Sequence, residues 1–127
     1  MEREAFKDLV KWKNNPDKKP LILRGARQVG KTWLMKEFGK RYYKKVAYIN
    51  FDDNVSIKET FEKNFDINRI IEEISFAVGF TIDPKDTLLI FDEIQECSKA
   101  LTSLKYFYEK APQYNIIAAG SLLGVAL

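Results

Sequence analysis

Short apolar runs alternate with amphipathic stretches along most of this chain. The run at 87–91 carries no polar residue between its ends, as expected for a strand that is covered on both faces. Strands that alternate with helices predict an α/β fold with a parallel sheet between two layers of helices. The pattern predicts strands at 20–24, 46–51, 87–91 and 115–119, and helices at 2–13, 33–40, 56–64, 66–78 and 98–110.

The spacing of apolar residues also predicts which helix faces are buried and where helices end. Asp66 precedes apolar residues at helical spacing and is a candidate N-cap, and Gly79 is expected to end that helix. Gly39 is expected to lie near the end of the helix that begins at Trp33. The side chains expected to face the core from two of the helices are Trp33, Leu34, Phe38, Leu101, Leu104, Phe107 and Tyr108.

The segment 25–32 reads GARQVGKT and fits G-x-x-x-x-G-K-[ST], the phosphate-binding P-loop. It lies between a predicted strand and a predicted helix, which is the context that a P-loop requires. Glycines allow the backbone N–H groups to approach phosphate, Lys31 would neutralise the β and γ phosphates, and Thr32 would hold Mg²⁺. An ordinary glycine turn before a helix is the alternative. The predicted nucleotide-binding residues are Gly25, Ala26, Arg27, Gln28, Val29, Gly30, Lys31, Thr32 and Trp33.

A second motif follows the third predicted strand, where four apolar residues precede Asp92 and Glu93. This is a Walker B pattern. Asp92 is placed to reach Mg²⁺, and Glu93 is placed to polarise an attacking water as general base. Two surface acids at a strand end are the alternative, which the preceding P-loop disfavours.

Other polar residues stand beside these motifs, each with a simpler alternative. Ser121, after the fourth strand, is a candidate sensor hydroxyl or a helix cap. Asp52 and Asp53 either assist Mg²⁺ or form a turn, and the turn is favoured. Arg27 contacts phosphate, a neighbouring subunit or a nearby acid, and Gln95 is a candidate contact of the Walker B acids.

Composition limits the remaining possibilities. A chain of 127 residues with 46% hydrophobic residues fits one domain, 1–127, with a real core. The net charge of +3 does not by itself argue for nucleic acid, and the basic cluster between Lys40 and Lys45 is better read as a solvated face. A single cysteine, Cys97, fits a small residue at a helix start in a reducing, cytoplasmic protein. The absence of histidine sets aside the usual zinc site, and no apolar run reaches the ~20 residues that span a membrane.

Taken together, four segments resemble one prokaryotic group of AAA-type ATPases. They are LRGARQVGKT at 23–32, YINFD at 48–52, FDEIQ at 91–95 and AGS at 119–121. The resemblance implies ATP with Mg²⁺, a catalytic glutamate after the metal-binding aspartate, and a P-loop strand that lies beside the fourth strand. Members of the group usually carry a nuclease-like domain after the ATPase core.

The chain departs from this pattern at its end, inside an apolar run that closes with Leu127. A complete AAA-type core continues to a fifth strand, an arginine finger and a helical lid. We therefore expect an N-terminal piece of a longer protein, in which the edge of the strand at 20–24 is apolar and covered by a missing segment or a partner chain. Self-association could supply the arginine, and slow hydrolysis is expected without it.

Three functions remain open at this stage. The first is an ATPase core that converts hydrolysis into motion of a further domain. The second is a binding module in which nucleotide acts as a switch or structural ligand. The third is a small phosphotransferase, which is disfavoured because no arginine-rich segment follows the third strand.

Overall fold

The structure is a computed structural model and describes residues 2–24 and 30–120. Helices and strands alternate over this range, as the sequence predicts, and most boundaries agree within two residues. In chain order the elements are α1 (Glu2–Asn14), β1 (Leu21–Leu23), α2 (Lys31–Tyr42), β2 (Lys45–Asn50), α3 (Val55–Lys63), α4 (Ile67–Val78), β3 (Thr87–Asp92), the short 3₁₀ turn η1 (Ile94–Glu96), α5 (Ser98–Lys110) and β4 (Asn115–Ala119).

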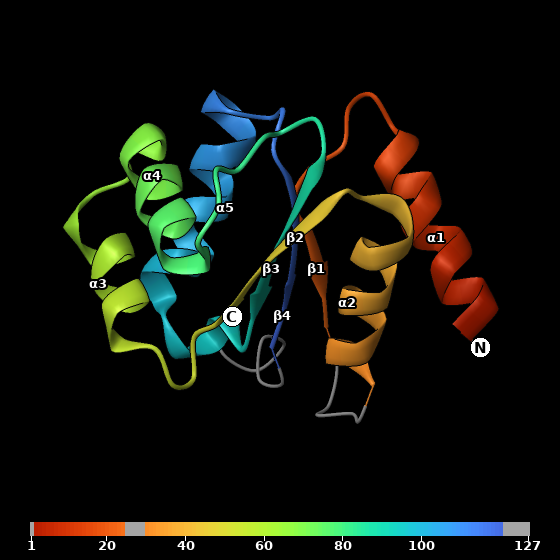
Figure 1. Cartoon of the computed structure of the whole chain (residues 1–127), viewed down its shortest axis with the longest axis horizontal. Helices are drawn as coiled ribbons and strands as arrows, with labels where there is room; N and C mark the ends of the chain where they lie inside the picture. Colours follow the sequence, from red (N-terminus) through yellow and green to blue (C-terminus); the bar gives the residue numbers. More distant parts are fainter. Residues whose placement is uncertain (1, 25–29, 121–127) are drawn as a thin grey trace.

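The described strands form one parallel sheet in the order β1-β4-β3-β2 (Figure 1). The strand that precedes the glycine-rich loop therefore lies beside the fourth strand, as predicted, and β3 lies between β2 and β4. Because all these strands run in one direction, their carboxyl ends meet at the same edge of the sheet. Open sheets of this kind bind ligands at that edge.

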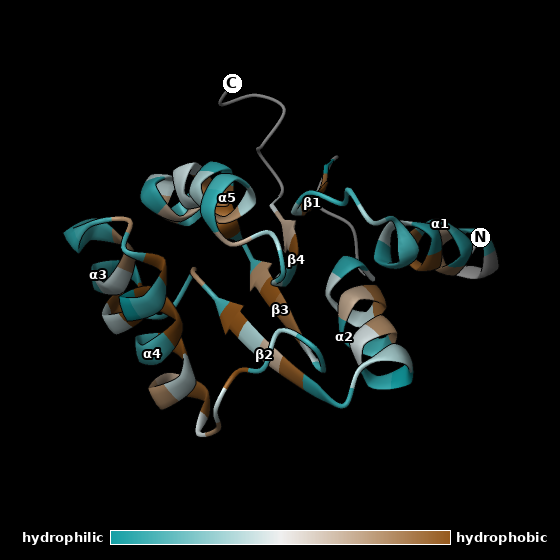
Figure 2. Ribbon diagram, turned by 90° about the horizontal axis from the view of Figure 1, so that it is seen from above, coloured by the Kyte–Doolittle hydropathy of each residue, from teal (hydrophilic) through white to brown (hydrophobic). Residues whose placement is uncertain are grey.

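Helices cover both faces of the sheet (Figure 2). On one face α2 packs against the strands, and α1 lies on the outer side of α2; α3, α4 and α5 cover the other face. The residues of β3 and β4 are all buried, which confirms for β3 the prediction from its unbroken apolar pattern.

Alternation along the strands decides which residues face which layer. Leu88 and Ile90 of β3 pack with Met35 and Phe38 of α2, whereas Leu89 and Phe91 belong to the cluster under α3, α4 and α5. The same alternation turns Asp92, two residues after Ile90, toward α2. The end of β3 thus presents a carboxylate to the first turn of that helix.

The predicted helix ends around α4 are confirmed. The Asp66 carboxylate accepts a hydrogen bond from the backbone N–H of Arg69 at 3.4 Å and caps the helix. Gly79 ends the helix in the left-handed region, with φ of 87°, where a residue with a Cβ is strained.

The predicted end of α2 near Gly39 is wrong, because the helix continues to Tyr42. Gly39 is buried inside the helix, on the side that faces the sheet. A Cβ at this position would lie 2.5 Å from Cγ2 of Val46 and 3.1 Å from Cδ2 of Leu88. The glycine therefore serves close helix–strand packing rather than helix termination.

Two aromatic side chains expected in the core are exposed instead. Trp33 is 45% exposed and meets the ring of Phe6 edge-on, on the side of α2 that faces α1. Tyr108 is 40% exposed, and the Lys19 ammonium lies over its ring at 5.1 Å. Successive residues of a helix point about 100° apart, so the buried stripes through Phe38 and Phe107 exclude these two positions.

At the edge of the described sheet, β1 is more accessible than the strands beside it. Its residues Leu21, Ile22 and Leu23 are half-buried. The edge is therefore apolar, as predicted, and its pairing with a further segment or chain stays a prediction.

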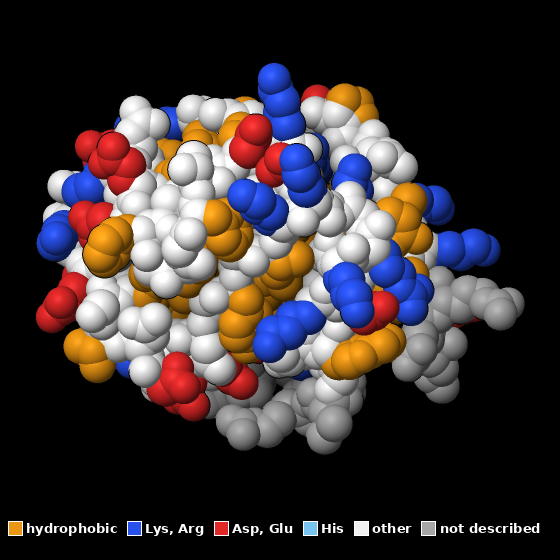
Figure 3. Space-filling view, in the orientation of Figure 1, with side chains coloured by type: hydrophobic (Ala, Val, Ile, Leu, Met, Phe, Trp, Pro, Cys, Tyr) orange, Lys and Arg blue, Asp and Glu red, His pale blue; other side chains and the backbone are white. Residues whose placement is uncertain are grey.

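Lys and Arg are concentrated on one side of the molecule, whereas charges of both signs are mixed on the other (Figure 3). Lys and Arg predominate over α1 and α2 (Figure 3). Lys40 and Arg41 in the last turn of α2, Lys44 between α2 and β2, and Lys45 at the start of β2 are all exposed. Arg41 forms an ion pair with Glu37 at 2.9 Å and lies over the ring of Phe6. This exposure agrees with the interpretation of the basic cluster as a solvated face.

Candidate functional site

The central contact of the site joins the start of α2 to the end of β3. Thr32 is the second residue of α2, and its hydroxyl donates a hydrogen bond to Oδ2 of Asp92 at 2.6 Å. The two residues are 60 positions apart in the chain. The fold thus brings together the two motifs that were recognised separately in the sequence.

The turn into α2 depends on Gly30. Its φ of 127° lies in a region that residues with a Cβ rarely adopt, and its carbonyl oxygen accepts the first intrahelical bond, from Leu34, at 2.7 Å. Lys31 and Thr32 follow directly at the N-terminus of the helix, where the backbone N–H groups of a first helical turn and the helix dipole favour an anion. Both residues are half-buried.

Asp92 is almost fully buried, with 4% of its surface exposed, and its carboxylate accepts two further hydrogen bonds. The hydroxyl of Tyr48 donates to Oδ2 at 2.7 Å, and the backbone N–H of Glu93 donates to Oδ1 at 3.0 Å. Burial and the hydrogen bond to Asp92 raise the pKa of the Tyr48 hydroxyl above its ordinary value. That hydroxyl therefore remains protonated, and a donor, at neutral pH.

Glu93 leaves the sheet through an unusual backbone conformation. Its φ of 53° and ψ of 45° are left-handed, and among the described residues it is the one non-glycine residue with positive φ. Its carboxylate Oε1 accepts a hydrogen bond from Nε2 of Gln95 at 2.8 Å. The other end of that amide, Oε1 of Gln95, is buried and has no hydrogen-bond partner among the described residues.

This arrangement of loop, helix and strand ends coincides with a match to a family model. The model described as "AAA domain" matches residues 17–127, which is most of the chain. The chain belongs to this family of AAA domains. AAA domains in general bind and hydrolyse ATP, and the α/β fold with its parallel sheet is that of the family.

Other comparisons add little to this assignment. No curated protein matches the chain. Among solved structures, one of PCH-2 from C. elegans is similar with a TM-score of 0.49 and 16% identity, covering 99% of this chain and 35% of that one. This AAA domain thus spans about a third of the length of that protein.

Those site residues predicted from the sequence that the structure describes lie together in this AAA domain. Gly30, Lys31, Thr32, Asp92 and Glu93 lie at the carboxyl edge of the sheet. Trp33 lies in the same first turn of α2 and is exposed. The loop residues Gly25, Ala26, Arg27, Gln28 and Val29, and the sensor candidate Ser121, lie outside the described residues.

Three smaller predictions can be compared with the structure. Asp52 and Asp53 are exposed in the turn after β2, where the Asn50 side chain accepts a hydrogen bond from the Asp52 backbone, in agreement with the turn interpretation. Gln95 contacts a Walker B acid, as proposed. Burial raises the pKa of the Cys97 thiol, which fits a packed residue at the start of α5 rather than a reactive one.

The oxygen atoms at this edge fit Mg²⁺. Among the described residues there is no group of three or more His, Cys, Asp or Glu side chains that could hold a metal by itself. Mg²⁺ in nucleotide sites commonly takes only one or two protein oxygens, together with phosphates and waters. The Thr32 hydroxyl and the Asp92 carboxylate are such a pair, and they already lie in contact.

Sequence reasoning gave Tyr48 no part in the site, although this residue opens the YINFD segment at 48–52 and donates to Asp92 in the structure. Its partner in the sheet register is Ile90, so it lies two positions before the level of Asp92 and on the same face. The position was visible in the sequence as a polar ring two residues before Asn50. The hydrogen bond from Tyr48 to Asp92 was not visible in the sequence, because it depends on the pairing of β2 with β3.

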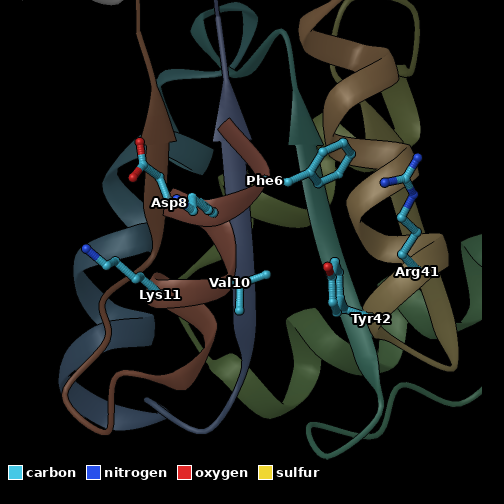
Figure 4. A pocket seen from close by; sticks show the side chains of 7 residues that line it. Phe6, Asp8, Val10, Lys11, Arg41 and Tyr42 are labelled. Carbon is cyan, nitrogen blue, oxygen red and sulfur yellow. The ribbon is translucent and has the colours of Figure 1, made fainter. Parts of the chain in front are cut away.

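A separate groove lies on the outer side of α2 (Figure 4). It has a volume of about 720 Å³ and lies between α1 and the end of α2. Arg41 and Tyr42, in its wall, are about 15 Å from Lys31 along the helix axis, at 1.5 Å per residue. It is therefore not the nucleotide site. The lining residues are Phe6, Lys7, Asp8, Val10, Lys11, Arg41 and Tyr42.

No helix in the described part of this AAA domain is both long and apolar enough to cross a membrane.

Proposed function

We propose that this chain is the nucleotide-binding core of an ATPase, which binds ATP with Mg²⁺ and hydrolyses it. The observation that carries the proposal is the 2.6 Å hydrogen bond from the Thr32 hydroxyl to the Asp92 carboxylate. It joins the P-loop to the Walker B strand. Membership of the AAA domain family supports the same activity.

Binding is assigned to the start of α2 and the loop before it. The backbone of the segment 25–30 would cradle the phosphates, Lys31 would neutralise their charge, and Trp33 would lie beside the nucleotide. Thr32 and Asp92 would hold the metal. When bound, Mg²⁺ neutralises charge on the β and γ phosphates.

Hydrolysis is assigned to Glu93. Its carboxylate takes a proton from a water molecule, the water oxygen bonds to the γ-phosphorus, and the bond between that phosphorus and the β,γ-bridging oxygen breaks to release ADP and phosphate. Gln95 holds the Glu93 carboxylate, and Ser121 is proposed to contact the γ-phosphate.

The proposal extends to parts beyond this chain. An arginine supplied by a second copy or by a following lid would stabilise the transition state, a contribution of about 10³–10⁵ in rate. The chain alone is therefore expected to bind ATP well and to hydrolyse it slowly. The same proposal includes a nuclease-like C-terminal domain, which ATP hydrolysis would move. It also includes a cytoplasmic location.

Phosphate release, measured beside nucleotide binding, tests this function. With Mg²⁺ present, we expect both ATP and a nonhydrolysable analogue to raise the melting temperature of the chain. We also expect slow phosphate release from ATP, which should depend on Glu93. Binding without any release, even with the full-length protein, would favour the nucleotide switch. Phosphoryl transfer to an added nucleoside monophosphate would favour the phosphotransferase.

A further inference from the structure

Tyr48 lies beside the proposed metal site without belonging to either sequence motif. It is a half-buried residue of β2, and its hydroxyl donates to Oδ2 of Asp92 at 2.7 Å. Oδ2 is also the atom that accepts the Thr32 hydroxyl at 2.6 Å. One carboxylate oxygen thus receives donors from two different elements, α2 and β2.

The ring of Tyr48 also contacts α2. The ammonium of Lys36 lies 4.0 Å from the ring centroid, within the range of a cation–π contact. Lys36 follows Thr32 by four residues, so both side chains project from the same face of the helix. Consequently Lys36 of α2 contacts the tyrosine ring, and Thr32 of α2 donates to the same Asp92 oxygen as the tyrosine hydroxyl.

These contacts leave the Asp92 carboxylate little freedom. A carboxylate offers about four lone-pair positions. Two on Oδ2 are occupied by Thr32 and Tyr48, and one on Oδ1 by the backbone N–H of Glu93. Without the tyrosine hydroxyl, one fixed donor would be lost and the carboxylate could turn about its bond to Cβ.

We propose that Tyr48 is a positioning residue for the metal site: it fixes the Asp92 carboxylate beside Thr32 and so sets the affinity of the nucleotide complex for Mg²⁺. This inference rests on the proposed ATP–Mg²⁺ binding. Tyr48 itself acts only through Asp92. Partners of this kind around metal ligands commonly change metal affinity by 10–100-fold when they are removed.

Tyr48→Phe removes the hydroxyl and keeps the ring under Lys36. Tyr43→Phe is the matched control, because its hydroxyl also donates to a side chain beside the sheet, Oδ1 of Asn115 at 2.9 Å, at the opposite end of the strands. ATP binding is followed by calorimetry over a range of Mg²⁺ concentrations and in EDTA.

We expect the half-saturating Mg²⁺ concentration of Tyr48→Phe to rise about tenfold. ATP binding in EDTA should equal that of the original chain, and Tyr43→Phe should show no shift. A Tyr48→Phe protein with the original melting temperature and the original Mg²⁺ dependence would overturn the inference while leaving the proposed function intact. If the unaltered chain bound no ATP at any Mg²⁺ concentration, the proposed function itself would fail, and this inference with it.

Lys36→Met gives a second test that keeps the hydroxyl. Losing the cation over the ring should raise the half-saturating Mg²⁺ concentration about two- to fivefold. If Tyr48→Phe does not fold, the Lys36→Met variant tests the inference by itself. An unchanged Mg²⁺ dependence of ATP binding in Lys36→Met would then contradict the inference.

Discussion

The side-chain amide of Gln95 donates a hydrogen bond to the Glu93 carboxylate at 2.8 Å, across a turn that begins with Glu93 in a left-handed conformation. The contact fixes the direction of the residue that we propose as general base. It arises from local geometry, because the turn after β3 brings the two side chains to the same side.

Replacing Glu93 with Gln should separate binding from hydrolysis. The amide retains the size of the carboxylate but does not accept a proton, so we expect phosphate release to fall by about 10²–10⁴ while ATP affinity is kept. The measurement is phosphate release beside calorimetric ATP binding. Glu96→Gln, in the same turn and exposed, is the control. Loss of ATP binding in Glu93→Gln would show that the base assignment is wrong.

Replacing Gln95 with Ala should weaken the same step without affecting binding. Losing one hydrogen bond to a charged group corresponds to about tenfold in rate, and we expect this decrease in kcat with an unchanged KM. The exposed Gln113→Ala serves as control. An unchanged kcat would mean that Glu93 is directed by its backbone alone.

The close approach of α2 to the sheet makes Gly39 sensitive to one added methyl group. In Gly39→Ala the new Cβ would meet the Val46 side chain at 2.5 Å. Overpacking of this kind costs about 1–3 kcal/mol, which exceeds the gain of about 1 kcal/mol in helix propensity. We expect a net loss of up to about 2 kcal/mol in the free energy of unfolding, measured by denaturant titration.

A double variant shows whether the clash causes that loss. Gly39→Ala combined with Val46→Ala should be less destabilised than the sum of the two single changes, because each relieves the other. A single Gly39→Ala that stabilises the chain would contradict the packing seen here.

Acid should remove a contribution of Glu73 to stability. The hydrogen bond from the Thr60 hydroxyl, and then that from Arg69, lower the pKa of this carboxyl below its ordinary 4.5. A lowered folded-state pKa stabilises the fold above the unfolded-state value, and this stability is lost as pH falls through the folded-state pKa. The side chain is 33% exposed, so we expect less than about 1 kcal/mol.

The measurement compares the unaltered chain with Glu73→Gln by denaturant titration at several pH values. The difference in unfolding free energy should be full at pH 7 and should shrink below pH 4.5. Glu72→Gln, the exposed neighbour, should show no such trend. A Glu73→Gln difference that grows toward acid pH would have the wrong sign for this account.

The strands and the site edge could be predicted from sequence because their signals are local. Unbroken apolar runs gave β3 and β4, and motif spacing gave Thr32, Asp92 and Glu93. The parallel sheet then placed those strand ends together. The N-cap of α4 at Asp66 and its end at Gly79 could also be predicted, because they depend on the preferences of single residues.

The errors came from contacts between elements. The sequence places Gly39 near the end of its helix, whereas in the structure it lies inside α2, where the absence of a Cβ allows the close contact with Val46. Trp33 and Tyr108 were placed in the core by hydrophobicity, although neighbours on the same helices already filled the buried stripes. Tyr48 was missed because its contact with Asp92 depends on strand register.

The central claim is that the start of α2 and the end of β3 form a site for ATP with Mg²⁺, and calorimetric titration of ATP tests it most directly. The unaltered chain should bind ATP more tightly with Mg²⁺ than in EDTA. Lys31→Ala should lose most of this affinity, whereas Lys40→Ala, an exposed lysine of the same helix, should retain it. Equal binding by Lys31→Ala and Lys40→Ala, or no binding by the unaltered chain, would contradict the account.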